Sequence, residues 1–474
     1  MQLRDYQADQ LDRARAKMRE GVRRVLLQLP TGGGKTVMAA EMLGGASTRA
    51  LTCWFIVHRR ELIEQTSRTF TEAGIDHGVI GAGFPESVHK GIQIAGVQTL
   101  VNRLDRLPPP QMIVTDEAHH AVAGTWQNIL ERFPDAWQLG LSATPERLDG
   151  RGLKDRFDCI VKGPTTAELI ARGFLSPYQY FAPGKPDMIG VRTSHGDFNR
   201  GDLSAMMDKP KLIGDVVEHY MRLASGKAGI VFAASREHSR HMEAAFLDAG
   251  VRAAHVDGSM GDKERKRLVD AFRAGDLEVL CNVDLFGEGF DVPGIVYVGL
   301  ARPTKSLALH LQQVGRALRV MEGKQQAIIA DHAGNAFLHG LPDDVREWSL
   351  EGRVKRAGAL GPSDAFSIRQ CLDCYRVSPS GTSVCPGCGI VFASAGRKVA
   401  QEEGELFQLD RAALAAKAKV DKAALAEVRK AEERECTTIG ELTLLAKSRG
   451  YSNAAGWAYH KFSSRKSWQN RSAA

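Results

Sequence analysis

A glycine-rich segment at residues 30–36, PTGGGKT, has the residue types that phosphate binding requires. Glycines allow backbone N–H groups to approach phosphate oxygens, and the N-terminus of a following helix adds a favourable dipole. The apolar run VLLQL at 25–29 precedes the segment and an apolar helix start follows it, as in a nucleotide-binding loop, although Leu29 stands where the usual motif has a glycine. Lys35 would contact the β- and γ-phosphates, and Thr36 would ligate Mg²⁺. The predicted phosphate-binding residues are Pro30, Thr31, Gly32, Gly33, Gly34, Lys35 and Thr36.

Two adjacent carboxylates, Asp116 and Glu117, follow the apolar run MIVT at 112–115. An Asp–Glu pair at a strand end is by itself usually a solvated turn, but here it follows a phosphate loop in the same chain. In that context Asp116 would hold Mg²⁺, and Glu117 would orient and deprotonate an attacking water. Lys35, Asp116 and Glu117 are therefore predicted to be catalytic.

Four of the eight cysteines, Cys371, Cys374, Cys385 and Cys388, form two C-x2-C pairs separated by ten residues. This spacing lets four thiolates converge on one tetrahedral ion, so it predicts a zinc ribbon and not a disulfide framework. Four thiolates leave no open position, which makes the predicted site structural. The ribbon could bind DNA or dock a protein partner, and the sequence leaves both open.

Short apolar runs alternate with amphipathic stretches through most of the chain, which predicts buried parallel strands in an α/β fold. The predicted strands lie at 25–29, 54–57, 91–95, 112–115, 138–141, 229–233, 252–256, 278–282, 295–300 and 326–330. A stretch rich in Gly, Pro and Asp separates the two groups and predicts a linker. The expected order is a first domain at 1–180, a linker at 181–210, a second domain at 211–345, a zinc ribbon at 366–393 and a helical tail at 397–474.

The motifs, in this order, resemble those of superfamily 2 helicases of the DEAH-box type over about residues 2–335. Beyond the phosphate loop, the resemblance rests on LRDYQ at 3–7, DEAH at 116–119, SAT at 142–144, NVDLFGEGFD at 282–291 and QQVGRALR at 312–319. It implies two tandem RecA-like motor domains that bind ATP with Mg²⁺ in the cleft between them.

The resemblance also implies roles for individual residues at the nucleotide. The further nucleotide-binding residues would be Arg4, Gln7, Gly289, Asp291 and Gln312. Arg316 and Arg319 would act as arginine fingers that neutralise charge on the transferring phosphoryl group. The residues that couple hydrolysis to domain movement would be His119, Ser142, Ala143 and Thr144.

Nucleic acid would cross both domains in such a protein, and its expected contacts are Arg60, Gln98, Thr99, Ser235 and Arg236. Amides, hydroxyls and guanidinium groups suit the phosphate backbone, so we expect sequence-tolerant, salt-dependent binding. The alternative for Arg60 and its neighbour Arg59 is that they cap a helix and stay solvated. An isolated R-x-x-R such as 316–319 is likewise more often a basic helix face.

Three further segments, TPERL at 144–148, ARPTKS at 301–306 and DHAGN at 331–335, are similar to the RadD-type DNA-repair ATPases and related phage helicases. The resemblance favours a DNA helicase or translocase of repair, recombination or replication that acts on single-stranded or forked DNA. Two alternatives stay open: an RNA helicase with the same motor, and an ATP-switched adaptor that recruits a partner through the ribbon.

The composition excludes some classes of protein. Of 474 residues, 43% are hydrophobic and 25% are charged, which excludes a disordered or fibrous protein. No apolar run approaches the roughly 18 residues of a membrane span, so we expect a cytoplasmic, nucleoid-associated protein.

The net charge of +7 has a local source in 452–474, which lacks acidic residues and interleaves Lys and Arg with aromatic side chains. These residues could stack on bases, or their aromatic side chains could form the core of a helical hairpin.

Overall fold

The computed structural model describes residues 2–85, 87–120, 124–147, 150–182, 188, 191–194, 197–283, 285, 294–352, 368–392, 427, 430–433, 435–449 and 453–471. The chain divides into two compact units, Met1–Ser394 and Ala395–Ala474. The first unit contains two α/β lobes and the cysteine cluster, and the second unit is helical.

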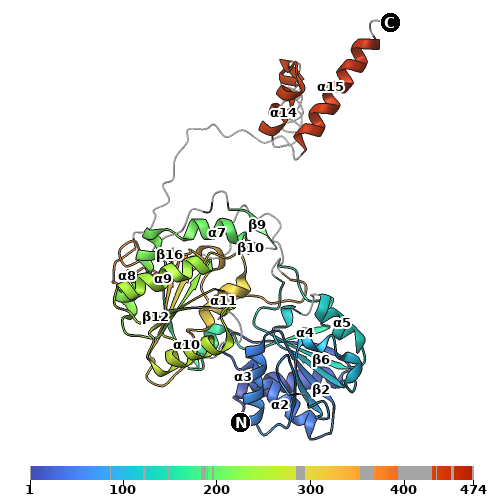
Figure 1. Ribbon diagram of the computed structural model, residues 1–474, viewed down its shortest axis with the longest axis vertical. Coiled ribbons are helices and arrows are strands. Elements are labelled where there is room, and N and C mark those ends of the chain that lie inside the picture. Colours follow the sequence, from blue (N-terminus) through green and yellow to red (C-terminus); the bar gives the residue numbers. More distant parts are fainter. Residues whose placement is uncertain are drawn as a thin grey trace, which may run out of the picture. The chain divides into compact units, whose positions relative to one another are not determined.

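The first lobe is built on a seven-stranded parallel sheet in the order β3-β4-β2-β5-β6-β1-β7 (Figure 1). Its strands are β1 (Arg24–Gln28), β2 (Cys53–Val57), β3 (Gly78–Ile80), β4 (Ile92–Gly96), β5 (Met112–Thr115), β6 (Trp137–Ser142) and β7 (Cys159–Lys162). Its helices are α1 (Asp5–Arg19), α2 (Lys35–Ser47), α3 (Arg60–Glu72), α4 (Val97–Leu100), α5 (Gly124–Arg132) and α6 (Thr166–Ala171). Every residue of β2 is buried, as expected for a strand covered on both faces.

The second lobe has a six-stranded parallel sheet in the order β12-β13-β11-β14-β15-β8. Its strands are β8 (Tyr178–Phe181), β11 (Gly229–Ala233), β12 (Ala253–Asp257), β13 (Val279–Val283), β14 (Tyr297–Ala301) and β15 (Ala327–Asp331). Its helices are α8 (Pro210–Ala224), α9 (Arg236–Asp248), α10 (Asp262–Ala274), α11 (Leu307–Gly315) and α12 (Ala336–His339). All ten predicted strands are present, with ends shifted by one or two residues at most.

The region expected to be a linker, 181–210, contains folded elements in its described part. These are the short strands β9 (Thr193–Ser194) and β10 (Asp197–Phe198) and helix α7 (Arg200–Met207). Asp197 accepts hydrogen bonds from the Thr304 hydroxyl (2.9 Å) and the Lys305 backbone N–H (2.7 Å), so this region is fastened to the second lobe. The expected boundary at residue 180 also falls inside β8, because parallel pairing with β15 places that strand in the second sheet.

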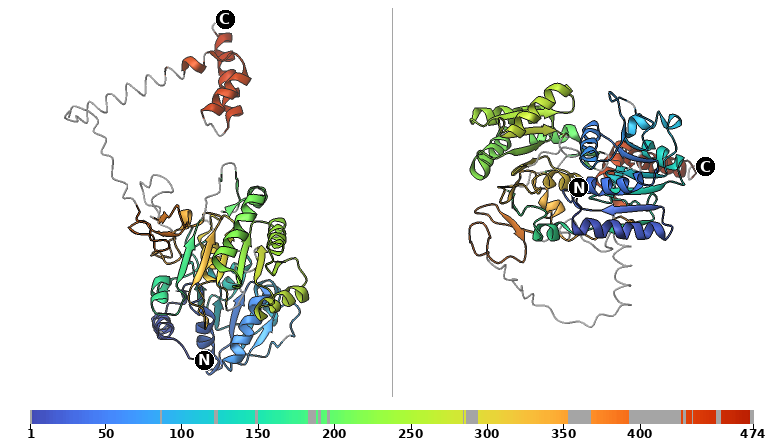
Figure 2. Two further views of the ribbon diagram at one scale, coloured as in Figure 1. Left: turned by 90° about the vertical axis from the view of Figure 1, so that its left-hand side faces the viewer. Right: turned by 90° about the horizontal axis from the view of Figure 1, so that it is seen from below.

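The cysteine segment forms a hairpin of β16 (Ile368–Gln370) and β17 (Val377–Pro379) against the edge strand β8. Ala182 donates its backbone N–H to the Tyr375 carbonyl at 3.1 Å, and Phe181 bridges Arg376 in antiparallel fashion. Val377 is buried in the same core cluster as the strands of the lobe. Figure 2 shows the hairpin, coloured orange, beside the second lobe. The hairpin therefore covers a strand edge that would otherwise present unpaired backbone groups.

The second unit contains α14 (Ile439–Ser448) and α15 (Ala454–Arg471), which pack on each other. Its buried side chains are those of Leu442, Ala446, Ala454 and Ala458, whereas Tyr459 is 61% exposed. Among the described side chains of this unit the fully buried ones are thus aliphatic, while those of Trp457 and Phe462 are half-buried. Residues 397–426 of the expected helical tail lie outside the described residues. Within the described residues no helix has the length and apolarity that crossing a bilayer would take.

Candidate active site

The phosphate loop follows β1 and leads directly into α2, as its sequence context predicts. Gly32 and Gly34 have φ values of 84° and 89°, a left-handed conformation that other residues rarely adopt. A Cβ atom on Gly34 would lie 2.3 Å from the Gln7 side-chain nitrogen, so that position also has no room for a side chain. Glycine is thus required here both by the backbone conformation and by contact with the first helix.

Gln7 joins the N-terminal motif to the phosphate loop. Its side-chain N–H group donates to the Gly33 carbonyl at 3.0 Å, and its side-chain oxygen accepts from the Arg4 backbone N–H at 2.9 Å. The Tyr6 hydroxyl donates to the same Gly33 carbonyl at 2.8 Å. The structure therefore brings Gln7 to the loop directly and Arg4 to it through the Gln7 side chain.

Phe174 and Arg172 join this end of the site, although no sequence motif marks them. The Arg4 guanidinium lies 4.6 Å from the centre of the Phe174 ring, and the Arg172 guanidinium lies 5.0 Å from it. Arg172 also forms an ion pair with Asp5. Residues 172–174 come from the end of the lobe, so only folding reveals that they flank the motif near the N-terminus.

Asp116 and Glu117 stand at the end of β5, beside the loop. Burial and the neighbouring Glu117 raise the pKa of Asp116 to about 6, while the Lys35 ammonium opposes that rise. Glu117 has a φ of 46°, a strained conformation for a residue with a side chain, which persists only where the surroundings enforce it. Lys35 and Glu117, both half-buried, thus lie close enough to the buried Asp116 to act on its charge.

The DEAH and SAT motifs are in contact. His119 Nδ1 lies 3.4 Å from Glu117 Oε2 and 3.5 Å from the Ser142 hydroxyl. Ser142 in turn donates to the Thr144 carbonyl at 2.9 Å. Ala143 and Thr144 are buried directly after β6. A short chain of polar contacts therefore runs from the carboxylate pair to the segment predicted to couple hydrolysis to movement.

The second lobe brings its arginine motif to the phosphate loop. A Cβ atom on Gly315 would lie 2.6 Å from Thr31, and one on Gly32 would lie 3.7 Å from Arg319 Cγ. Burial lowers the pKa of Arg319 to about 10, and Gln312 and Arg316 are also buried. The predicted nucleotide contacts Gly289 and Asp291 lie outside the described residues.

The residues around the loop fit a magnesium-bound nucleotide. The buried hydroxyls of Thr31 and Thr144 have no hydrogen-bond partner within the described part of the chain. A buried hydroxyl that lacks a partner costs free energy, so these groups suit a polar ligand. Thr36 in the first turn of α2 and the carboxylate of Asp116 supply the oxygen ligands that Mg²⁺ prefers.

The residues predicted to contact nucleic acid differ in their exposure and in their neighbours. Arg60 lies at the start of α3 and reaches Asp262 of the second lobe at 3.5 Å, while Arg265 pairs with Glu61 at 3.0 Å. Arg236 is exposed but lies 3.4 Å from Asp257. Ser235 caps α9 by accepting from the His238 backbone N–H. Gln98 is exposed on α4 and Thr99 is half-buried. Arg60 and Arg236 thus have acidic neighbours that a phosphate backbone would have to displace.

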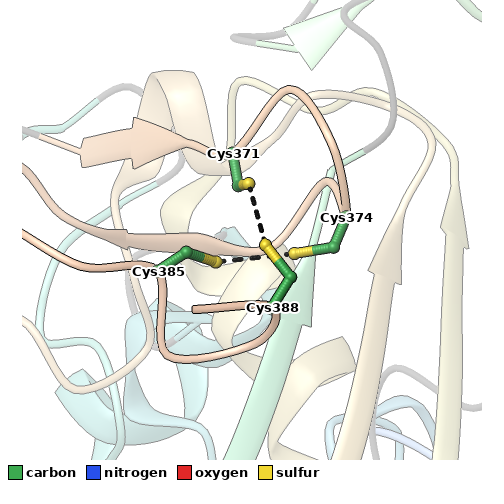
Figure 3. A group of neighbouring side chains, drawn as sticks. All are labelled: Cys371, Cys374, Cys385 and Cys388. Carbon is green, nitrogen blue, oxygen red and sulfur yellow. Dashed lines mark hydrogen bonds between the residues drawn. The ribbon is translucent and has the colours of Figure 1, made fainter. Parts of the chain in front are cut away.

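The four predicted zinc ligands converge, with all four sulfur atoms within 4.8 Å of one another. Cys371 Sγ lies 3.6 Å from Cys388 Sγ, and Cys374 Sγ lies 3.5 Å from Cys385 Sγ (Figure 3). Burial alone would raise the pKa of Cys385, but backbone N–H groups of Cys388 and Gly387 lower it to about 6. The convergence of four sulfur atoms suits the tetrahedral coordination of Zn²⁺.

Replacing Asp116 with asparagine is expected to stabilise the folded chain at pH 8 while it abolishes ATP hydrolysis. The raised pKa means that ionisation of Asp116 costs stability as pH rises from about 4 to about 6. Asparagine removes that cost, on the order of 2 kcal/mol. Unfolding without Mg²⁺ should therefore show a larger gain at pH 8 than at pH 4.5. The exposed Asp105→Asn variant should show no such gain, and an equal gain for Asp116→Asn at both pH values would contradict the prediction.

Comparisons with known proteins agree with this geometry. A family model described as the res subunit of type III restriction enzymes matches residues 1–147, and a helicase conserved C-terminal domain matches residues 208–321. A 51.5 kDa protein of a Lactococcus phage is 37% identical over 370 residues, which cover 78% of each chain. The candidate ATP-dependent helicase Irc3 of Saccharomyces cerevisiae is 30% identical over 354 residues, or 70% of this chain. The aligned part spans about half (51%) of Irc3.

More distant proteins share the same lobes. The DNA 3′-5′ translocase XPB2 of Sulfurisphaera tokodaii is 25% identical over 368 residues, covering 67% of this chain and 79% of its own. Among solved structures, a fragment of a candidate HsdR subunit of a type I restriction enzyme from Vibrio vulnificus superposes with a TM-score of 0.58 at 24% identity, covering 72% of this chain and 65% of its own. At that identity the superposition shows the fold alone.

Proposed function

The chain belongs to superfamily 2 of the helicases, and on that premise we propose that it is a nucleic-acid-stimulated ATPase of the DEAH-box type that moves along or unwinds DNA. Membership of this family supports ATP hydrolysis. The observation that carries the proposal is the approach of the arginine motif of one lobe to the phosphate loop of the other.

The proposed reaction follows from the charges assembled at the loop. The Lys35 ammonium would hold the β- and γ-phosphates, and Glu117 would orient a water and accept its proton. Arg316 and Arg319 would stabilise the charge that develops as the γ-phosphoryl group leaves. Bound Mg²⁺, held by Thr36 and Asp116, would neutralise phosphate charge. When the phosphoryl group departs, the attraction between the lobes weakens and they can separate.

DNA is favoured as the track because the relative XPB2 is described as a DNA translocase. We propose single-stranded or forked DNA as the substrate and repair, recombination or replication as the setting. The zinc ribbon would then add a surface for DNA or for a protein partner.

Single-stranded DNA is expected to raise the ATPase rate, with a stimulation that falls steeply as salt increases, because backbone phosphate contacts release counterions. The measurement compares single-stranded DNA, duplex, fork and RNA at two salt concentrations, together with strand displacement on the fork. Equal rates with and without any nucleic acid would refute the proposal. Stronger stimulation by RNA would indicate an RNA helicase, and ATPase without strand displacement would indicate a translocase or adaptor.

A further inference from the structure

A strap of residues 341–352 leaves the second lobe and ends on the first. At its start, the Arg346 guanidinium donates to the carbonyls of His339 at 2.9 Å, Leu341 at 2.8 Å and Asp344 at 3.0 Å, which fixes the strap to the second lobe. None of the sequence motifs includes this segment. The strap is thus a second connection between the lobes, in addition to the chain between α6 and β8.

The far end of the strap, residues 350–352, pairs with residues 151–154 of the first lobe, and we call this contact the clasp. Lys154 donates its backbone N–H to the Leu350 carbonyl at 3.0 Å, and Arg151 bridges Gly352 in antiparallel fashion. A Cβ atom on Gly152 would lie 1.8 Å from the Leu350 carbonyl oxygen and 2.3 Å from the Gly352 nitrogen. Only a glycine permits so close an approach of two backbones, so the contact is specific.

The clasp is in contact with the segment that carries the DEAH motif, residues 116–119, which we call the DEAH turn. Leu350 packs against a small buried cluster formed by Leu26, Ala118, Leu153 and Phe157. Ala118 follows Glu117, whose left-handed backbone needs support from its surroundings. Leu26 belongs to β1, the strand that leads into the phosphate loop. One side chain from the strap therefore braces the small core beneath both catalytic segments.

We infer that the strap positions the DEAH turn for ATP hydrolysis, which makes Leu350 and Gly152 positioning residues. The inference rests on the proposed ATPase function. Displacement of the strap would leave nucleotide binding intact, because no residue of the phosphate loop at 30–36 belongs to the cluster that Leu350 contacts. It would let Glu117 relax from the orientation that attack by water requires, and a misplacement of about 1 Å can cost on the order of a hundredfold in rate.

The test compares two variants that release the clasp from opposite sides. Leu350→Asp places a charge in the small core, and Gly152→Ala inserts a methyl group where the Leu350 carbonyl lies. Both should lower kcat for ATP at least tenfold, with ADP affinity and KM within about twofold of the native values. The single variant Leu350→Met, which keeps an apolar side chain at this position, should retain the native kcat. The matched controls are Glu351→Gln, which removes only an exposed ion pair with Lys154, and Gly124→Ala, where a Cβ meets nothing within 4 Å.

Hydrogen exchange gives a readout that does not depend on turnover. Peptides covering 114–120 and 150–158 should exchange faster in both clasp variants and be unchanged in both controls. Unchanged exchange at 114–120, or a kcat within twofold of native, would overturn the inference, as would a parallel loss of ADP affinity. A native chain that hydrolyses no ATP would overturn the proposed function instead, and the exchange data would still decide whether the strap braces the turn.

Discussion

Lys35→Ala is expected to lower the nucleic-acid-stimulated ATPase rate by about a hundred- to a thousandfold while the chain stays folded. Removing a single charged or hydrogen-bonding group that stabilises a transition state typically costs that much. Lys35 opens α2, and its ammonium acts on the buried carboxylate of Asp116, so its loss removes positive charge where the phosphates would lie. The measurements are steady-state ATPase with single-stranded DNA and thermal unfolding.

The control for this variant is Lys17→Ala. Lys17 lies on α1, is about half exposed and pairs with Glu20, so its removal should leave the ATPase rate within twofold. The folded state should survive Lys35→Ala because the helix keeps its buried residues, among them Met38 and Leu43. Native ATPase activity in Lys35→Ala would show that the glycine-rich loop is not the phosphate site.

Cys374→Ser is expected to reduce bound zinc from one ion per chain to near zero and to unfold the hairpin at 368–392. A ribbon this short has little core of its own, and structural zinc supplies about 10 kcal/mol or more to such domains. Because Val377 packs into the second lobe and the hairpin covers the edge of β8, its unfolding should also expose that edge. Metal analysis and limited proteolysis within 368–392 would measure both effects.

Cys436→Ser is the matched control, because Cys436 lies in the other unit and is not among the four converging sulfurs. It should retain zinc and the native proteolysis pattern. ADP affinity should change little in Cys374→Ser, since the phosphate loop belongs to the first lobe. A Cys374→Ser chain with full zinc content and a protected hairpin would exclude the four-thiolate site.

The sequence placed the candidate site residues in the right local structures because their signals are local. Gly32 and Gly34 could be placed in a phosphate loop from their neighbours alone, since one strand, one turn and one helix start form the loop. The spacing of the four cysteines similarly carries its own geometry, and the sulfurs do converge. The ten buried strands were found because each is a short apolar run between polar turns.

Elements without such a local signal were missed. The strands β3, β7 and β8 stand at the edges of their sheets, are only three or four residues long and are only partly buried, so their apolar pattern is weak. The region predicted to be a linker, 181–210, contains folded elements in its described part, because Asn199 caps α7 and Asp197 accepts hydrogen bonds from the second lobe. Composition alone cannot separate such a segment from a flexible one.

By itself, then, the sequence identified the candidate residues for binding phosphate, activating water and holding a metal, since those abilities belong to side chains and short turns. Tertiary structure alone decided what surrounds them: Phe174 beside Arg4, Arg319 beside Gly32, and the strap whose Glu351 reaches Lys154 across 197 residues of chain. Contacts over such separations depend on how two sheets and their connections pack. No pattern within a single stretch of residues encodes that packing.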